Sequence, residues 1–332
     1  MSKRPSEALR LLEAYTQAHG TSGHEDAVRA IFVRELRGRT LQADGLGGVL
    51  ASPSKEKQGP RVVLTAHMDE IGFLVQAVTH DGFLRLTPVG GWPDGVLAAQ
   101  RLRIWSRSAQ PHQGGAQAAS ADKVLVDIGA RSAESVARLG IRPGDPVVPE
   151  GPFTDLAEPG LYSAKAFDNR VGMAALTLAT HELDAYATPC DLLAVATVQE
   201  EVGCRGAVVA ARLAKPDVVI VLEGPPADDL PGLAPHGESQ GALGGGVQVR
   251  AYDPTAIMNP RLAVRRTGGT DARSFQAHEL GVPVIVLGVP ARYIHTHNAV
   301  IDLADLQACV DLSVALVRRL DAKTVKSLTQ VL

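Results

Sequence analysis

Imidazole and carboxylate side chains directly follow several short apolar segments of this sequence. Residues 61–66, 191–198 and 217–222 are such segments, and they run into His67-Met68-Asp69-Glu70, Gln199-Glu200-Glu201 and Glu223. A carboxylate beside a buried apolar segment is costly unless it is paired, and a divalent cation would neutralise it. Imidazole and carboxylate together are ligands for zinc or a similar first-row cation. These residues therefore predict a metal site.

Asp168 and a pair of histidines are further candidates. Asp168 lies just before a predicted helix, where a carboxylate is also a common N-cap, so capping and metal binding are equally open at this point. His295 and His297 follow a fourth apolar segment, 282–289. If that stretch of chain is extended, both histidines face the same side and either could reach the site.

The elements that must position these residues are strands and helices in alternation. The predicted strands are 61–66, 191–198, 217–222 and 282–289, and the predicted helices are 6–19, 24–37, 169–183, 206–213 and 302–320. This alternation is typical of an α/β fold with a mainly parallel sheet covered by helices. Because ligands gather at the carboxyl ends of parallel strands, we expect the candidate residues to meet at one edge. Between the first two helices, Ser22 and Glu25 fit a capping box.

The segment from residue 71 to 161 has a different pattern of apolar and polar residues. Short apolar runs are separated by Gly, Pro and Asp, and apolar and polar residues alternate, which predicts a small β-rich module inserted into the α/β domain. Residues 106–120 are rich in Gln, Ala and Gly without periodicity and are predicted to be a mobile loop. Residues 1–70 and 162–332 would then form one domain together, interrupted by the module.

Composition excludes several classes of protein. The chain has 332 residues, a formal net charge of −3, 45% hydrophobic residues and 4% aromatic residues. It can bury a core, so it is not disordered overall, and its near-neutral charge argues against nucleic-acid binding. No apolar stretch is long enough for a membrane span, and residues 1–20 do not resemble a secretory signal. Three cysteines cannot form a disulfide framework, which favours a cytoplasmic location.

Six motifs in order give the sequence a specific resemblance. They are Ala66-His67-Met68-Asp69-Glu70-Ile71-Gly72, Phe167-Asp168-Asn169-Arg170-Val171-Gly172, Val198-Gln199-Glu200-Glu201-Val202-Gly203, Leu222-Glu223-Gly224, Gly268-Gly269-Thr270-Asp271-Ala272 and Arg292-Tyr293-Ile294-His295. Over nearly its whole length the chain resembles the TET-type (tetrahedral) dinuclear-metal aminopeptidases of clan MH. Members of this family are also called glutamyl or deblocking aminopeptidases and cellulase M.

The resemblance implies a role for each candidate residue. His67 and Glu223 would hold one metal ion, Glu201 and His295 the other, and Asp168 would bridge both. Asp69 would accept the free N–H of the His67 ring and fix its tautomer. Glu200 would be the general base. It would take a proton from a water molecule between the two ions, which then attacks as hydroxide, and pass the proton to the leaving amine.

The family also implies a substrate and an assembly. The substrates would be short peptides that lose their N-terminal residue, and the ions would be Zn²⁺, with Co²⁺ or Mn²⁺ as alternatives. The inserted module would be a barrel-like dimerisation domain, and dimers would assemble into a hollow tetrahedral dodecamer. Two other enzymatic or binding functions stay open: an N-acyl amino-acid deacylase or other small-amide hydrolase, and an inactive assembly subunit.

The inactive alternative is motivated by a short segment. Only residues 261–267 separate Asn259-Pro260 from Gly268, where the family has a helix and part of a strand. Seven residues are too few for a helical crossover. Arg261-Leu262-Ala263 resembles the start of that helix and Val264-Arg265-Arg266 the end of that strand. Elsewhere, Cys204 could be a soft metal ligand, but a small buried side chain is the favoured interpretation.

Overall fold

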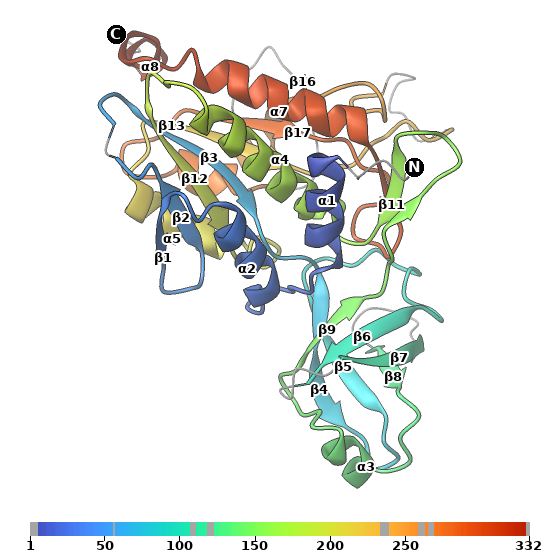
Figure 1. Ribbon diagram of the computed structural model, residues 1–332. Helices are drawn as coiled ribbons and strands as arrows, with labels where there is room; N and C mark the ends of the chain where they lie inside the picture. Colours follow the sequence, from blue (N-terminus) through green and yellow to red (C-terminus); the bar gives the residue numbers. More distant parts are fainter. Residues whose placement is uncertain are drawn as a thin grey trace.

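The computed structural model describes residues 6–55, 57–106, 111–117, 123–232, 239–257, 263–264 and 269–329. It consists of an α/β domain and a smaller β-barrel that projects from it (Figure 1). Among these residues, no helix is long and apolar enough to cross a membrane.

A nine-stranded mixed sheet forms the centre of the α/β domain. The strand order is β1-β2-β12-β3-β13-β17-β14-β15, and β16 pairs with β14. The strands are β1 (Thr40–Ala43), β2 (Val49–Ser52), β3 (Arg61–His67), β12 (Asp191–Thr197), β13 (Val218–Glu223), β14 (Gln248–Asp253), β15 (Ala256–Ile257), β16 (Ala263–Val264) and β17 (Val284–Gly288). The four central strands β12, β3, β13 and β17 are parallel. The predicted α/β fold with a mainly parallel core is therefore confirmed.

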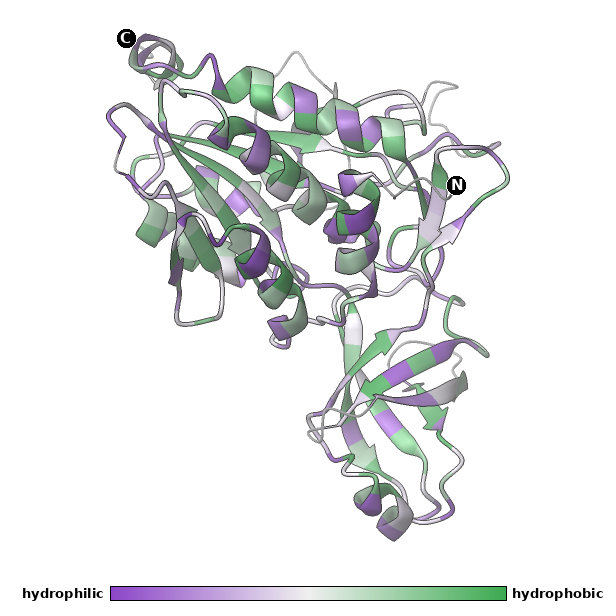
Figure 2. Cartoon of the chain, in the orientation of Figure 1, coloured by the Kyte–Doolittle hydropathy of each residue, from purple (hydrophilic) through white to green (hydrophobic). Residues whose placement is uncertain are grey.

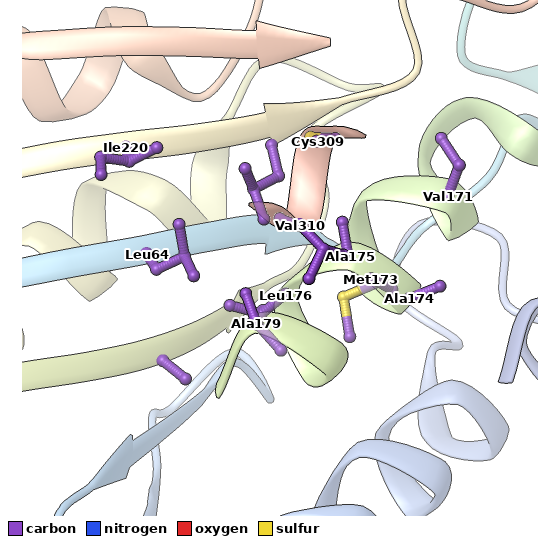
Figure 3. Close-up of a cluster of buried hydrophobic side chains, with 14 of the residues drawn as sticks. Leu64, Val171, Met173, Ala174, Ala175, Leu176, Ala179, Ile220, Cys309 and Val310 are labelled. Carbon is purple, nitrogen blue, oxygen red and sulfur yellow. The ribbon is translucent and has the colours of Figure 1, made fainter. Parts of the chain in front are cut away.

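The central strands are apolar along their length because helices cover both faces of the sheet. Leu64 of β3 points into the larger cluster under one set of helices, and its neighbour Val63 points into a second cluster on the opposite face. The first set is α1 (Glu7–Gln17), α2 (Asp26–Glu35), α4 (Phe167–Asp184), α7 (Leu303–Val317) and α8 (Ala322–Thr329); the second is α5 (Arg205–Ala214) and α6 (Ala272–Gln276). Figure 3 shows Leu64 and Ile220 facing the buried side chains of α4 and α7. Green, hydrophobic positions likewise concentrate along the strands in Figure 2.

Strand register brings the ends of the central strands level with one another. His67 is paired with Thr197 across β3 and β12, and Glu223 with Gly288 across β13 and β17. Residues that end or follow these strands therefore lie along one edge of the sheet, as the sequence predicted.

The inserted strands close into a six-stranded antiparallel barrel of order β4-β5-β8-β7-β6-β9. They are β4 (Gly72–Val78), β5 (Leu84–Val89), β6 (Arg101–Trp105), β7 (Pro111–Gln117), β8 (Leu125–Asp127) and β9 (Pro146–Pro149), with α3 (Ala133–Arg138) between the last two. The barrel has its own apolar interior, which includes Phe73, Leu102 and Val126.

Two details of the sequence prediction are wrong, the loop at 106–120 and the capping box. The loop predicted at 106–120 contains β7, which pairs with β6 and β8; residues 107–110 and 118–120 lie outside the described part. Where the predicted module ends, strands β10 (Thr154–Asp155) and β11 (Leu161–Ala164) form a separate three-stranded sheet with β18 (Ala299–Asp302). The predicted capping box is absent, because Ser22 Oγ donates to Asp69 and the Glu25 carboxylate accepts from the backbone N–H groups of Gly23 and Gln199.

The short segment 261–267 is described only at Ala263–Val264. These two residues pair in parallel with β14, so Ala263 lies in a strand and not at the start of a helix. The rest of the predicted deletion, residues 261–262 and 265–267, lies outside the described residues.

Candidate metal centre

The candidate residues meet in one cavity of about 500 Å³ at the carboxyl edge of the sheet. His67 and Glu223 are the last residues of β3 and β13, and the Glu200–Glu201 pair follows β12. Asp168 comes from the first turn of α4, and His295 from the loop after β17. Gly224 makes this approach possible, since a Cβ there would lie 2.7 Å from the carbonyl oxygen of Phe167.

One group of donor atoms consists of His67, Asp168 and Glu223. The Nε2 atom of His67 lies 3.3 Å from Asp168 Oδ1 and 3.6 Å from Glu223 Oε2. One donor atom from each residue falls within 4.8 Å of the others, which is close enough for all three to hold one cation.

A second group consists of Asp168, Glu201 and His295. The Nε2 atom of His295 lies 3.3 Å from Asp168 Oδ2 and 3.3 Å from Glu201 Oε1. Its Nδ1 atom is 2.7 Å from the carbonyl oxygen of Gly91, so a residue of the barrel module orients this ring. Asp168 thus turns one carboxylate oxygen toward each histidine.

Capping does not explain Asp168. Asp168 has a non-helical backbone (φ −80°, ψ 107°), and the N–H of Gly172 in the first regular turn of the helix donates to Asn169 Oδ1 at 3.0 Å, not to Asp168. Its carboxylate is directed at His67 and His295 instead.

His297 lies apart from the two groups. The Nε2 atom of His297 is 3.1 Å from the carbonyl oxygen of Arg101, and the residue is 2% exposed. Tyr293 and His295 have φ values of 57° and 59°, so the chain turns here and the two histidines do not share a side as an extended segment would require.

Asp69 supports the site in more ways than the sequence indicates. Its carboxylate is 3.4 Å from Nδ1 of His67, although the carbonyl oxygen of Asp69 is nearer to that atom, at 3.1 Å. The carboxylate also accepts hydrogen bonds from Ser22 Oγ and from the backbone N–H groups of Glu200 and Glu201, at 2.6, 2.9 and 3.1 Å. Asp69 therefore fixes the loop that carries both glutamates.

The electrostatics of the site fit bound cations. Burial raises the pKa of Glu201 to about 7, and it also raises the pKa of Glu223. Burial alone would lower the pKa of His295, but the facing carboxylates of Asp168 and Glu201 raise it to about 11. Glu223 Oε1 has no hydrogen-bond partner among the described residues. Buried carboxylates in excess, including Glu223 with its unpaired oxygen, form a donor set suited to divalent ions.

Glu200 lies beside this donor set. Its Oε2 atom is 3.9 Å from His67 Nε2, and Cys204 Sγ donates to its Oε1 atom at 3.3 Å. Burial, reinforced by the negative charges of Glu223 and Asp271, raises the pKa of Glu200 well above its usual value. Its position beside the donor set would let this carboxyl group accept a proton from a molecule bound there and return it.

Sequence reasoning assigned no role to several residues of the cavity. Asp271 is fully buried behind it and accepts a hydrogen bond from the Thr197 hydroxyl. Arg250 and Arg273 line the wall, together with Thr255 and Thr270. Asp271 and Thr270 lie in a motif noted in the sequence, but the arginines carry no comparable signal.

Comparisons with known proteins find relatives that match most of the chain. A family described as "M42 glutamyl aminopeptidase" matches residues 47–312. The glutamyl aminopeptidase of Lactococcus lactis is 32% identical, over 90% of this chain and 92% of the relative. A TET aminopeptidase from a Thaumarchaeota archaeon superposes with a TM-score of 0.92 at 31% identity, covering 97% and 99% of the two chains. The TET1 peptidase of Pyrococcus horikoshii, which can assemble into a tetrahedron or a large octahedral shell, gives 0.81 at 27% identity, covering 94% and 100%.

Proposed function

The chain belongs to the M42 glutamyl aminopeptidase family, and we propose that it is a dinuclear-metal aminopeptidase that removes N-terminal residues from short peptides. The position of Asp168 carries the proposal. Its two carboxylate oxygens face two different histidines, each at 3.3 Å, and a separate glutamate completes each group. This is the arrangement that two cations sharing one bridging carboxylate require.

The proposed ligands are divided between two ions. His67 and Glu223 would hold one, Glu201 and His295 the other, and Asp168 both. When bound, two such ions polarise the scissile carbonyl and lower the pKa of water. The mixed nitrogen and oxygen donors favour Zn²⁺, with Co²⁺ or Mn²⁺ as alternatives.

Glu200 is the proposed general base. It lies at the edge of the donor set and its raised pKa suits it to take a proton from the attacking water and return it to the leaving amine. Asp69 is the proposed positioning residue, because it accepts hydrogen bonds from the backbone of Glu200 and Glu201.

A substrate panel tests the reaction. Protein reconstituted with Zn²⁺, Co²⁺ or Mn²⁺ is assayed on free-amino dipeptides and aminoacyl anilides, on their N-acylated forms, and after chelation. We expect cleavage of the free-amino substrates only, and its loss on chelation. Cleavage of the N-acylated compounds alone would favour the deacylase, and no turnover of either class would favour an inactive assembly subunit.

The Glu200→Gln variant tests the proton transfer. We expect kcat to fall by about 10²–10⁴-fold while two metal ions stay bound, because the amide keeps the shape of the side chain but cannot accept the proton. Activity within tenfold of the original protein would contradict the role of Glu200.

We also propose a domain division and an assembly. Residues 1–70 and 162–332 would form the catalytic domain and residues 71–161 a dimerisation domain, with dimers forming a tetrahedral dodecamer. The tetrahedron reported for the Pyrococcus horikoshii peptidase supports this, since dimers on six edges give twelve chains. Light scattering is expected to give roughly 420 kDa, twelve times the 34.9 kDa chain. A mass of about 70 kDa would leave the dimer as the final state.

A further inference from the structure

A third group of potential ligand atoms lies beside the proposed general base. Glu200, Cys204 and Asp271 each place one such atom within 4.8 Å of the others. Cys204 and Asp271 belong to neither of the groups that surround Asp168. Glu200 and Cys204 both line the cavity, so an ion from solvent can reach them.

The turn after β12 places the thiol against the carboxylate. Cys204 follows Glu200 by four residues, and its backbone N–H donates to the Glu200 carbonyl at 2.9 Å. Its Sγ atom is 3.3 Å from Glu200 Oε1. Ligands at about 2.3 Å (sulfur) and about 2.1 Å (oxygen) from one tetrahedral zinc ion are separated by a similar distance.

Asp271 supplies an independent indication of a ligand. The residue is 0% exposed, and one of its oxygens accepts from the Thr197 hydroxyl. The other, Oδ1, has no hydrogen-bond partner among the described residues. A buried carboxylate oxygen without a partner is costly, and a cation would remove that cost.

We propose that Glu200, Cys204 and Asp271 form a third cation site, selective for a soft divalent ion such as Zn²⁺ or Cd²⁺, and that filling it inhibits the enzyme. A thiolate among the ligands favours these ions over Mg²⁺ or Mn²⁺. On binding, the thiol proton of Cys204 leaves to solvent and a metal–sulfur bond forms. The ion then holds the Glu200 carboxylate, which can no longer accept a proton. Only this inhibitory consequence rests on the proposed function; the site itself does not.

Cadmium titration tests the site without reference to turnover. Protein loaded with two equivalents of Zn²⁺ is titrated with Cd²⁺ while thiolate-to-cadmium charge-transfer absorption is followed in the ultraviolet. The ligands of the two primary sites contain no sulfur, so exchange there gives no such band. We expect the band and a third bound equivalent in the original protein, and neither in Cys204→Ala.

Two further variants keep this test specific. Cys190→Ala removes a fully buried cysteine that lies outside the cavity, and it is expected to keep the band. Asp271→Asn preserves the shape of the side chain and is expected to weaken cadmium binding at least tenfold. An equal band in Cys204→Ala, or a third equivalent bound equally tightly in that variant, would overturn the site.

Excess Zn²⁺ tests the inhibitory role. Half-inhibition of peptide hydrolysis is expected to need at least tenfold more Zn²⁺ in Cys204→Ala than in Cys190→Ala. Equal inhibition of the two variants would overturn the inhibitory role. If no peptide is hydrolysed at all, the proposed function fails, and the cadmium band still decides whether the site exists.

Discussion

Two histidines separated by one residue have opposite surroundings. His295 faces Asp168 and Glu201 in the cavity, whereas His297 is buried against the carbonyl oxygen of Arg101. Burial also lowers the pKa of His297 to about 4, which keeps its ring neutral at physiological pH. The chain turn between them, with positive φ at His295, separates their roles.

Matched substitutions distinguish these roles. We predict that His295→Gln lowers the affinity for one of the two metal ions by about 100-fold or more. Even the loss of a residue that only orients a ligand lowers metal affinity by about 10–100-fold. His297→Gln is expected to bind both ions normally, because the amide can still donate to Arg101. Metal content after dialysis against a weak chelator measures both, and equal losses in the two variants would contradict the assignment.

Arg250 and Arg273 give part of the cavity wall a positive charge. Arg250 is 5% exposed, and its Nε atom has no hydrogen-bond partner among the described residues. One of its other nitrogens, Nη1, is 3.3 Å from Asp253. The guanidinium group therefore has donor capacity left for a substrate carboxylate.

An acidic first residue is therefore the expected preference. We predict that Arg250→Met lowers kcat/KM for a glutamyl anilide by about 10–100-fold and changes the value for a leucyl anilide by less than about threefold, because a hydrogen bond to a charged group contributes about 1.5–3 kcal/mol. A parallel fall for both substrates would show that Arg250 is structural.

The candidate ligands could be predicted because each ends or follows a strand, or opens a helix, within a recognisable motif. Asp271 could not be assigned in this way, since its role depends on Thr197, a residue 74 positions away. The capping box at Ser22 and Glu25 failed for a related reason. Both side chains form hydrogen bonds with residues distant in the sequence, Asp69 and the backbone of Gln199. The local sequence does not show that these residues lie nearby.

At the scale of elements, a buried ionic cluster joins β3, β11 and α4 at the site. Glu70, directly after Asp69, is 2.7 Å from Lys165 Nζ and 3.0 Å from Arg170 Nη2. Arg170 is fully buried and also donates to the carbonyl oxygens of Tyr15 and Ala18, where α1 ends. One anion thus balances two buried cations that flank Asp168.

Removing the negative charge of Glu70 is expected to destabilise the folded protein. We predict that Glu70→Gln lowers the free energy of unfolding by about 3–5 kcal/mol, because it leaves buried charge uncompensated. Asp26→Asn, which removes an exposed ion pair with Arg29, is the control and should cost less than about 1 kcal/mol. Urea denaturation of metal-free protein measures both, and similar small losses would show that the cluster is not a main source of stability.

Strands could be predicted where both faces are apolar, and they were missed where they are not. β3 is buried from Val62 onward and β13 is buried throughout, so a continuous apolar run marks them. β7 has the sequence Pro-His-Gln-Gly-Gly-Ala-Gln, without an apolar face, and it forms because β6 and β8 supply hydrogen-bond partners on both sides. Such pairing is a property of the closed barrel, so the sequence of β7 alone does not predict a strand.

At the scale of the whole molecule, the barrel meets the α/β domain through aromatic and histidine side chains. The ring of His19, just after α1, stacks on Trp105 of β6 with centroids 3.8 Å apart. On the other side of the joint, Trp92 lies against His297 at 6.2 Å. Because Gly91 also contacts the ring of His295, the joint and the proposed metal site are adjacent.

Protonation of His19 is predicted to lower the free energy of unfolding. Burial lowers the pKa of His19 to about 4, from about 6.5 in an unfolded chain, and the nearby Lys165 and Arg170 add to this against the opposing effect of Glu70. Between these two values the unfolded state binds more protons than the folded state, so stability falls as pH drops from about 6.5 to about 4. The shift corresponds to about 1–3 kcal/mol when allowance is made for partial exposure of the ring.

A phenylalanine at this position separates protonation from stacking. His19→Phe retains an aromatic ring against Trp105 but cannot take up a proton, so its unfolding free energy should lose about 1–3 kcal/mol less than that of the original protein between pH 7 and pH 4. Both proteins are measured metal-free, so that acid release of the ions does not contribute to the difference. Two parallel pH profiles would mean that His19 titrates normally. If the unfolding free energy of His19→Phe depends less on pH than that of the original protein, and only below pH 6.5, the joint between barrel and α/β domain is the acid-sensitive contact.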